Sequence, residues 1–293
     1  MGNLPKIDIH QHAQKMEYEP DGTPVVNFVT GKPSTADSDE SLIARTLEEM
    51  DKHNIVKSLI SDSFENIYRW VDAAPNRFIP SPMIDGNPPE PSVEAIRDEY
   101  RKGRIKGIGE IAAQYCGIPP NDPILEPYWA LAEELDAPVF IHLHGAGGFR
   151  PTFRSRCGYP LLLEDVLVKH PNIRICIENA GYPFLSDMIA LMMMHPTVYA
   201  DISTHTWIIN RDGLYDYLKA LLRGGFTSFK AKSEIVHGLP IPKRLMFGSD
   251  QMCWPETISM GVDAIESADF LTDEQRRDIF FNNAVRFMSL QFP

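Results

Sequence analysis

Two histidines separated by one residue, His10 and His12, follow the short apolar run KIDI near the start of the chain. Residues two apart on an extended segment project to the same side, so both imidazoles can approach one point. Two neutral imidazoles make up half of the ligand shell of a typical protein-bound zinc ion. An HxH pair alone is equally compatible with two surface histidines, so a metal site needs support from the rest of the sequence.

Further candidate ligands stand at the ends of other apolar segments. Glu110 lies at the end of IKGIGEI, His142 follows APVFI, and Asp250 follows LMFGS. Each has a simpler explanation, because an aspartate can cap a helix and a glutamate can pair with an arginine. Taken together, imidazole nitrogens and carboxylate oxygens suit Zn²⁺ or Mn²⁺. The pattern predicts a metal centre at these residues and the histidine pair, provided that the fold brings the segment ends together.

Short apolar segments alternate with helix-like segments along the chain. Strands are predicted at 6–10, 56–61, 77–84, 105–111, 137–144, 173–179, 197–203 and 243–250. Helices are predicted at 39–54, 65–75, 91–103, 125–136, 160–171, 184–196 and 211–225, and around 256–267 and 272–289. This alternation indicates parallel strands with right-handed crossovers, and at this length a (β/α)8 TIM barrel with extra C-terminal helices. An open doubly wound sheet is the alternative, but no glycine-rich loop follows the first strand.

The chain shows no linker and no internal repeat, so residues 1–293 are expected to form a single barrel domain. Long loops at 13–38 and 145–160, and at 204–242 apart from its helix, each follow a predicted strand. In a barrel of this kind such loops lie on the face that carries the active site. The candidate ligands and the long loops are therefore expected at the same end of the molecule.

Composition limits the partners. The formal net charge is −12, which argues against nucleic acid or an anionic membrane surface, since both attract clustered Lys and Arg. The N-terminus lacks a signal-peptide core, and no segment approaches the ~18 apolar residues of a membrane span. The cysteines are scattered without a CxxC pair, which favours reduced thiols. We expect a cytoplasmic protein with a small-molecule substrate, and a homo-oligomer is left open.

With these motifs in place, the chain resembles the amidohydrolase superfamily, in the branch of small metal-dependent hydrolases that includes aminocarboxymuconate-semialdehyde decarboxylase. The resemblance covers nearly the whole chain and rests on DIHQH (8–12), GIGEI (107–111), PVFIH (138–142), AGYP (180–183), LMFGSD (245–250) and NNAVRFM (282–288). It implies a (β/α)8 barrel with one divalent metal ion, Zn²⁺ before Mn²⁺, on the His10/His12 pair, His142 and Asp250. Glu110 stands where some members carry a metal-binding acid.

The sixth predicted strand departs from this resemblance. Members usually have a histidine there, in a segment like HAGxP, whereas this chain reads ENAGYP with Asn179 in the histidine's place. Asparagine cannot transfer protons near neutral pH, so we expect one metal ion and a hydrogen-bonding role for Asn179 toward substrate or water. His144, two residues beyond His142, is the candidate for the lost catalytic role. Glu178 is expected to be structural, because adjacent strand residues point to opposite faces.

The loops supply candidate substrate-binding residues. Arg150 and Arg154 lie in the loop after the fifth strand and could clamp a carboxylate, although a solvated basic patch would look the same. Trp254 follows the last strand and could form an apolar wall, and Trp207 and His205 are similarly placed after the seventh. The sequence does not rank these side chains.

The function that these residues indicate is hydrolysis of an amide, ester or lactone bond in a small molecule. A divalent ion makes hydroxide available near neutral pH and polarises the carbonyl. Asp250 would take the proton from the attacking water and deliver it to the leaving group. Two alternatives stay open: a non-oxidative decarboxylase on the same scaffold, and a catalytically impaired barrel used for binding.

Overall fold

The structure is a computed structural model that describes residues 4–145, 150–224 and 239–292. Parts of the predicted loops 145–160 and 204–242 lie outside the described residues. Within the described ranges the strands are parallel to their neighbours. In chain order they are β1 (Lys6–His12), β2 (Ile55–Asp62), β3 (Phe78–Pro82), β4 (Ile108–Ile111), β5 (Val139–His142), β6 (Ile175–Glu178), β7 (Val198–Asp201) and β8 (Leu245–Met246).

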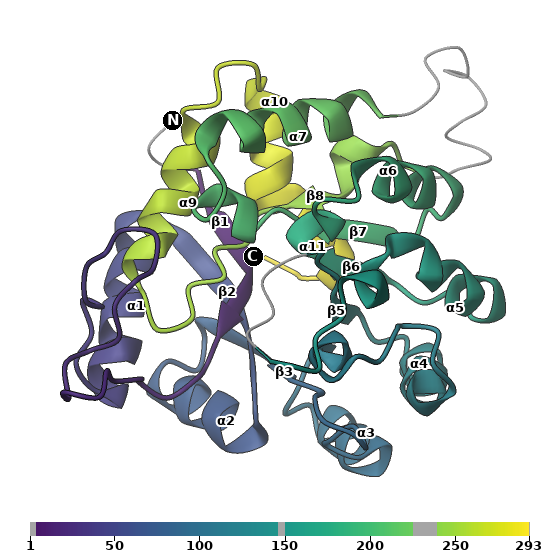
Figure 1. The fold of residues 1–293 in the computed structure, drawn as a ribbon, viewed down its shortest axis with the longest axis horizontal. Helices are drawn as coiled ribbons and strands as arrows, with labels where there is room; N and C mark the ends of the chain where they lie inside the picture. Colours follow the sequence, from purple (N-terminus) through teal and green to yellow (C-terminus); the bar gives the residue numbers. More distant parts are fainter. Residues whose placement is uncertain (1–3, 146–149, 225–238, 293) are drawn as a thin grey trace.

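Helices connect the strands and surround them (Figure 1). They are α1 (Asp39–Lys52), α2 (Phe64–Ala73), α3 (Val93–Arg101), α4 (Glu126–Leu135), α5 (Glu164–Lys169), α6 (Leu185–Met194), α7 (Arg211–Arg223), α9 (Glu256–Glu266), α10 (Asp273–Arg277) and α11 (Asn283–Met288). The first three begin where serines cap them, because Ser38, Ser63 and Ser92 each accept a hydrogen bond from the backbone N–H three residues later. The predicted helix 160–171 is shorter than expected, since its first turn is a 3-10 turn at Pro160–Leu163.

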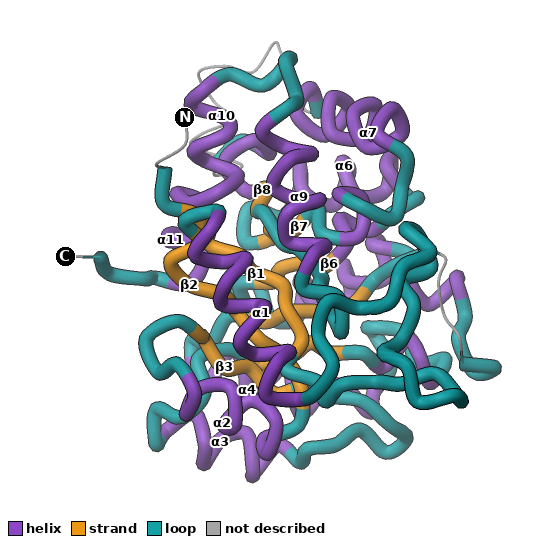
Figure 2. Tube along the Cα trace, turned by 90° about the vertical axis from the view of Figure 1, so that its left-hand side faces the viewer, coloured by secondary structure: helices purple, strands orange, loops and turns teal. Residues whose placement is uncertain are grey.

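The strands form two sheets, in the orders β1-β2-β3 and β4-β5-β6-β7-β8. Backbone hydrogen bonds join the sheets at both seams. The N–H of Ile9 in β1 donates to the carbonyl of Phe247 beyond β8 at 2.9 Å, and the N–H of Ile84 beyond β3 donates to the carbonyl of Glu110 in β4 at 2.7 Å. With strands inside and helices outside (Figure 2), the predicted (β/α)8 barrel with additional C-terminal helices is confirmed.

Apolar side chains fill the barrel in two separate clusters. The larger one lies between the strands and the surrounding helices. The smaller one lies inside the barrel and is sealed by α11; its buried members are Ile7, Ile9, Leu59, Ile79, Phe140, Cys176, Tyr199, Met246, Ala284, Phe287 and Met288. The ring of Phe287 lies 5.5 Å from that of Phe140 and 4.9 Å from that of Tyr199. Because Arg174, which precedes β6, donates to the carbonyl of Phe287, α11 closes the N-terminal end of the barrel.

An extra residue in β1 decides where the histidine pair points. Between Asp8 and Gln11 the first strand advances by three residues while β2 advances by two. Such an insertion reverses the face to which the following side chains point. Ile9 can therefore join the inner apolar cluster while His10 and His12 also turn toward the barrel interior.

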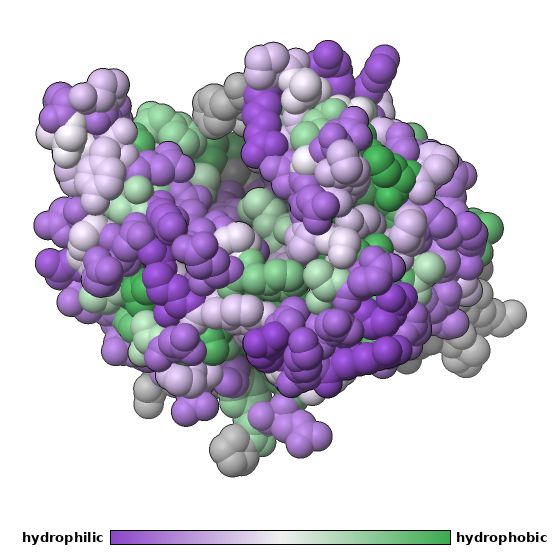
Figure 3. Space-filling view, turned by 90° about the horizontal axis from the view of Figure 1, so that it is seen from below, coloured by the Kyte–Doolittle hydropathy of each residue, from purple (hydrophilic) through white to green (hydrophobic). Residues whose placement is uncertain are grey.

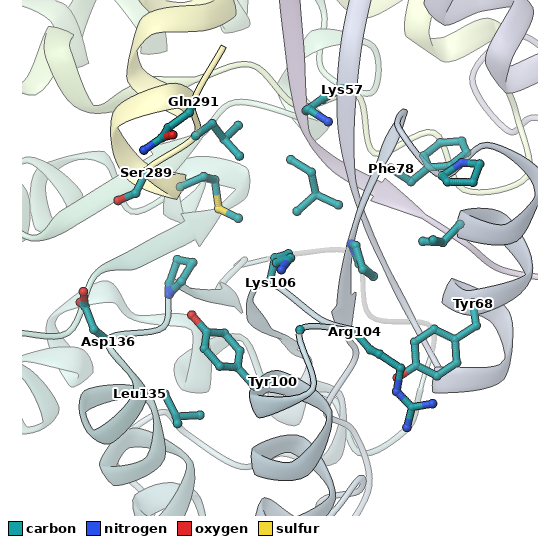
Figure 4. Close-up of a pocket in the computed structure, with 18 of the residues that line it drawn as sticks. Lys57, Tyr68, Phe78, Tyr100, Arg104, Lys106, Leu135, Asp136, Ser289 and Gln291 are labelled. Atoms are coloured by element: carbon teal, nitrogen blue, oxygen red, sulfur yellow. The ribbon is translucent and has the colours of Figure 1, made fainter. Parts of the chain in front are cut away.

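A cavity of about 930 Å³ opens at the N-terminal end of the barrel (Figure 4). Its walls include Lys57, Tyr100, Lys106 and Ser289, which come from the starts of strands, from α3 and from the segment after α11. The outer surface is mostly hydrophilic on the face shown in Figure 3, where hydrophobic residues form separate patches. Among the described residues, no helix has the length and apolar character required to cross a bilayer.

Candidate metal centre

Three neighbouring strands end in a buried polar residue that faces the barrel interior. These residues are His142 in β5, Glu178 in β6 and Asp201 in β7. Two positions earlier each strand contributes an aromatic or cysteine side chain to the inner apolar cluster. Since side chains alternate along a strand, both layers point inward. The barrel therefore carries a polar layer at the C-terminal ends of its strands, above an apolar floor.

Side chains of the first strand and of the loop after the last strand meet at one point in this layer. The Nε2 atom of His12 lies 3.0 Å from Oδ1 of Asp250, and Nε2 of His10 lies 3.7 Å from the same oxygen. One potential ligand atom from each residue lies within 4.8 Å of the others. Gly248 makes this approach feasible, because a Cβ atom there would lie 2.7 Å from Cβ of His10. The predicted ligands His10, His12 and Asp250 are thus brought together.

A carboxylate and a hydroxyl group orient His10. Its Nδ1 atom lies 3.0 Å from Oγ of Ser203 and 3.3 Å from Oδ2 of Asp201. This leaves Nε2 facing Asp250, which is the arrangement that outer partners impose on metal-binding histidines. Asp201 and Ser203 were not among the residues predicted from sequence, although Asp201 ends its strand in the same way as His142 ends β5.

Glu110 connects the His10/His12 pair with His142. One carboxylate oxygen lies 3.2 Å from Nδ1 of His142 and the other lies 3.7 Å from Nε2 of His12. His142 does not belong to either group of donors that lie within 4.8 Å of one another among the described residues. Its contact with Glu110 links it to the centre, because Glu110 also faces His12.

Asn179 lies beside the centre as a hydrogen-bonding residue. Its side-chain nitrogen is 3.4 Å from Nδ1 of His142, and its side-chain oxygen accepts a hydrogen bond from Ser203 at 3.1 Å. Its own N–H donates to Asp201 at 3.2 Å. These contacts tie together the residues that orient His10 and those that surround His142.

The side chain of Glu178 faces the centre, contrary to the orientation that strand alternation predicts for it. Glu178 is fully buried, and its Oε1 atom lies 4.0 Å from Nε2 of His10. With His10 and Glu110 it forms a second group of donors within 4.8 Å of one another. The prediction assumed that β6 continues through Asn179, but the strand ends at Glu178 and Asn179 has φ +60°. Glu178 pairs in register with His142, and paired residues of adjacent parallel strands share a face.

Burial and charge act in opposite directions on the ionisable groups of this centre. Burial alone lowers the pKa of His10, but neighbouring carboxylates raise it well above its ordinary value. Burial raises the pKa of Asp250, but His10 and His12 hold it well below its ordinary range. For Glu178, burial raises the pKa strongly and the neighbouring acids add to the effect, against the influence of His10. Several buried carboxyl groups thus lie close together beside imidazoles, which is a setting that a divalent cation can stabilise.

Several buried nitrogen and oxygen atoms that could bind a metal have no hydrogen-bond partner among the described residues. They are Nε2 of His10, Oε2 of Glu110 and both carboxylate oxygens of Glu178. A buried polar atom without a partner costs free energy, so such atoms persist where something else compensates them. Imidazole nitrogens and carboxylate oxygens that converge on one region form a donor set that fits a divalent metal ion.

His144 lies at the edge of the centre. Its ring stacks on Tyr182 with centroids 5.8 Å apart and lies 6.2 Å from the ring of His142. Its backbone N–H donates to the side chain of Gln114 at 3.0 Å. His144 belongs to neither group of converging donors within the described ranges, and its role in place of the absent strand-six histidine stays a prediction.

The two candidate arginines engage the protein itself. Arg150 forms an ion pair with Asp85 at 2.6 Å, and its guanidinium lies 5.6 Å from the ring centre of Tyr115. Arg154 donates to the carbonyls of residues 151 and 153 at 2.8 Å. The Tyr115 ring, in turn, lies 4.7 Å from that of His142. Arg150 is therefore linked to the centre through Tyr115, and Arg154 supports its own loop.

Trp254 is part of an aromatic group beside the centre. Its ring lies 5.6 Å from Phe28 and 6.0 Å from Trp207, and Phe28 and Trp207 are 5.7 Å apart. The indole N–H of Trp207 donates to the carbonyl of Ser249, the residue before Asp250, at 2.8 Å. Both tryptophans are buried, but Phe28 is 54% exposed. Phe28 was not predicted from sequence, because nothing in the loop 13–38 indicated that it folds back to this position.

The fold and the converging donors define a TIM-barrel protein with a candidate metal centre at the C-terminal strand ends. Residues 7–290 match the amidohydrolase family, and the chain therefore belongs to this family. Comparison with curated protein sequences gives no match.

Solved structures of this fold cover nearly the whole chain. A probable 2-pyrone-4,6-dicarboxylic acid hydrolase from Acinetobacter baumannii, with citric acid bound, is 14% identical with a TM-score of 0.63, over 98% of this chain and 100% of that one. A 5-carboxyvanillate decarboxylase from Novosphingobium aromaticivorans, complexed with manganese and 4-hydroxy-3-methoxy-5-nitrobenzoic acid, is 15% identical with a TM-score of 0.61 (98% and 96%). A 4-oxalomesaconate hydratase from Rhodopseudomonas palustris is 15% identical with a TM-score of 0.63 (97% and 95%). At these identities the likeness establishes the barrel fold.

Proposed function

We propose that the protein is a hydrolase of small-molecule amides, esters or lactones that uses one divalent metal ion, Zn²⁺ or Mn²⁺. The observation that carries the proposal is the convergence of His10 and His12 on Asp250, with an Nε2–Oδ1 distance of 3.0 Å for His12. Glu110 and His142 complete the surroundings of the ion. A bound divalent ion supplies Lewis acidity and lowers the pKa of water from 15.7 to about 7.

Asp250 is the group suited to proton transfer. Despite its burial, His10 and His12 hold the pKa of Asp250 below its ordinary range, so the carboxylate is ionised. Its position beside both histidines, rather than its basicity, suits it to accept the proton of a water bound there. It takes the proton of the attacking water and later delivers it to the leaving amine or alcohol. Ser203 and Asp201 fix the ring of His10 during this exchange, because both face its Nδ1 atom. His144, at the edge of the centre, takes no part in these steps.

The aromatic group of Phe28, Trp207 and Trp254 supports a substrate with an apolar part. Exposed aromatic surface beside a polar centre is suited to binding an apolar or flat ring. The solved 2-pyrone-4,6-dicarboxylic acid hydrolase of the same fold also supports a hydrolytic reaction on a small ring compound. Asn179, which lies between His142 and Ser203, is then available to hydrogen-bond the substrate or the attacking water.

Decarboxylation is the alternative that the same scaffold carries. The solved 5-carboxyvanillate decarboxylase with bound manganese supports it. A decarboxylase needs cationic groups that hold the substrate carboxylate, and the candidate arginines are engaged elsewhere, with Arg150 paired to Asp85 and Arg154 bonded to its own loop. Hydrolysis therefore takes precedence in our proposal.

The proposal is tested with the purified protein loaded with Zn²⁺ or with Mn²⁺. A panel of esters, lactones and amides is assayed for hydrolysis, and a panel of aromatic and unsaturated carboxylic acids for carbon dioxide release. We expect hydrolysis that falls at least about 100-fold in Asp250→Asn, the scale of a lost general acid–base group. Carbon dioxide release without hydrolysis would establish the decarboxylase instead. A metal-loaded protein that turns over neither panel would support the binding barrel.

The proposed single ion is tested by metal stoichiometry after reconstitution. Asn179 offers a neutral amide at the end of β6, and an amide oxygen is a poor ligand for an ion that prefers imidazole. We expect about one equivalent of metal in the wild-type protein and a higher value in Asn179→His, measured by elemental analysis. Two equivalents in the wild-type protein would contradict this part of the proposal.

A further inference from the structure

Glu178 is a buried acid that the proposed hydrolytic mechanism does not use. Its exposed fraction is 0%, and neither carboxylate oxygen has a hydrogen-bond partner among the described residues. Its Oε1 atom faces Nε2 of His10 at 4.0 Å. Glutamates are rarely buried completely unless something pairs with them, so a residue of this kind calls for a ligand.

A second buried acid faces the same place. One oxygen of Glu110 lies within 4.8 Å of both His10 and Glu178, and its Oε2 atom also lacks a hydrogen-bond partner in the described part of the chain. Two carboxylates so close together in a buried site repel each other unless a cation or a shared proton lies between them. The carboxylate oxygens of both acids face His10. Only one nitrogen of the His10 ring is available as a metal ligand.

That remaining nitrogen limits the number of ions. The Nδ1 atom of His10 is engaged by Ser203 and Asp201. The Nε2 atom, 3.7 Å from Asp250 and 4.0 Å from Glu178, is the one that faces a carboxylate of each group. One imidazole nitrogen binds one metal ion. The group of His10, His12 and Asp250 and the group of His10, Glu110 and Glu178 therefore describe one ion position.

We propose that Glu178 is a ligand of the same metal ion as His10, His12 and Asp250, and that it adapts the centre to Mn²⁺ relative to Zn²⁺. This inference rests on the single-ion centre of the proposed function. With Glu110 and Glu178, the donor set holds two imidazole nitrogens and three carboxylates. Carboxylate oxygens suit Mn²⁺, whereas catalytic Zn²⁺ is satisfied by three protein ligands that are mostly nitrogen or sulfur. The end of β6 thus supplies an oxygen ligand one residue before Asn179.

The inference is tested by the affinities of Mn²⁺ and Zn²⁺ for Glu178→Gln, measured by competition with a chelator. We expect Mn²⁺ affinity to fall by more than about 100-fold, beyond the roughly 10–100-fold effect of residues that only orient ligands. The fold loss of Zn²⁺ affinity should be at least about tenfold smaller than the fold loss of Mn²⁺ affinity, because Zn²⁺ depends less on an added carboxylate. The electron paramagnetic resonance spectrum of bound Mn²⁺ should also change. Glu133→Gln, which removes a carboxylate from α4 outside the centre, serves as the matched control and should bind both ions like the wild-type protein.

Thermal melting with and without metal separates a ligand from a structural residue. A ligand predicts that metal-free Glu178→Gln melts like the metal-free wild-type protein and gains less on addition of Mn²⁺. An equal loss of melting temperature in both states would overturn the inference. If Glu178→Gln does not fold, Glu178→Asp keeps the carboxylate on a shorter chain and should show an intermediate loss of Mn²⁺ affinity.

The outcomes also separate this inference from the proposed function. If the wild-type protein binds neither ion, the metal centre itself is wrong, and the inference is overturned with it. If the wild-type protein binds Mn²⁺ and Glu178→Gln binds it equally well, the centre stands but Glu178 is not a ligand. In that case the two buried acids share a proton.

Discussion

The two ends of the barrel differ in how their charged side chains are partnered. At the N-terminal end, a cavity of about 930 Å³ is bordered by basic residues, of which Arg174 and Lys57 are engaged by the protein. Arg174 pairs with Asp136 at 3.3 Å, and Lys57 donates to a backbone carbonyl at 3.0 Å. At the C-terminal end, Glu178 and Glu110 are buried with oxygens that no described residue satisfies.

This difference indicates that buried polar atoms without a hydrogen-bond partner are a better guide to a functional site than the size of a cavity. The N-terminal end is large and charged, but its groups stabilise one another and the apolar floor beneath them. At the C-terminal end, repulsion between buried carboxylates costs free energy, and a bound cation would offset that cost. In barrels of this type the N-terminal end is where residues chiefly serve stability. The following substitutions test that division.

Replacing Phe287 with alanine should have the largest effect, and it should be on stability alone. Phe287 is fully buried in the apolar floor, against Phe140 and Tyr199. Truncating such a side chain costs about 3–5 kcal/mol of the free energy of unfolding. Denaturant unfolding measures the loss, and a chelator competition on the folded variant should give wild-type metal affinity. A large loss of affinity at a temperature where the variant is folded would show that the two ends are coupled.

Replacing His12 with alanine should give the reverse result. The residue lies 3.0 Å from Asp250 in the candidate centre. We expect metal affinity to fall by more than about 100-fold, which exceeds the effect of removing an outer partner. Circular dichroism should be unchanged, and elemental analysis of the same sample reports occupancy. Lys106→Ala, at the exposed N-terminal cavity, is the control and should keep its metal. An unfolded His12→Ala variant would show that His12 supports the fold.

His205 tests the comparison further, because it is a buried side chain without a hydrogen-bond partner among the described residues, and it lies outside the candidate centre. Neither ring nitrogen has a partner among the described residues, and burial lowers its pKa from 6.5 to about 3, helped by His144. A depressed folded-state pKa contributes stability above pH 6.5 that is lost as the pH falls toward 3. At pH 5 the wild-type protein should have lost about 2 kcal/mol through this residue. His205→Phe should not show that loss.

Denaturant unfolding of both proteins at pH 7.5 and pH 5 isolates the difference. Other titrating groups are common to the two proteins, so they cancel. Metal affinity at pH 7.5 should be the same in both, since His205 is not part of either donor group. A His205→Phe variant that loses metal would mean that this histidine belongs to the functional site after all.

Arg150→Ala should have the smallest effect. Its ion pair with Asp85 is half exposed on the arginine side, and such pairs contribute below about 1 kcal/mol. We expect little change in the free energy of unfolding and in the KM of a hydrolysed substrate. A more than tenfold rise in KM, confined to substrates with a carboxylate, would show that Arg150 leaves Asp85 to bind substrate. That result would strengthen the decarboxylase alternative.

The barrel itself was predictable because strand and helix patterns alternate through the chain. The ends of the strands and helices were less predictable than their order along the chain. The predicted strand 243–250 is a regular strand only at Leu245–Met246. Phe247 and Asp250 still form single backbone hydrogen bonds with β1, but the backbone is irregular there, and Asp250 has φ +49°. Such irregular ends depend on contacts with other strands, and a single segment does not reveal them.

The candidate centre was predictable in part, for related reasons. His10, His12, Glu110 and Asp250 stood out as polar residues that end apolar segments. Asp201 also follows a short apolar run, VYA, so the sequence contains the same signal for it. The orientation of Glu178 differs from the prediction because β6 ends at this residue and regular alternation stops there. The extra residue in β1, which turns both histidines inward, is visible only in the pairing with β2.

The helix that seals the N-terminal end also has a consequence for how the protein is made. Phe287 and Met288 pack with Ile7 and Ile9, so the first strand and the last helix share one core. A ribosome adds roughly 5–20 residues per second, and the N-terminal strand emerges long before its partner exists. The floor of the barrel cannot assemble until α11 has left the ribosome. The apolar residues of β1 therefore wait for a partner that is made about 280 residues later, and closure of the floor follows the synthesis of α11.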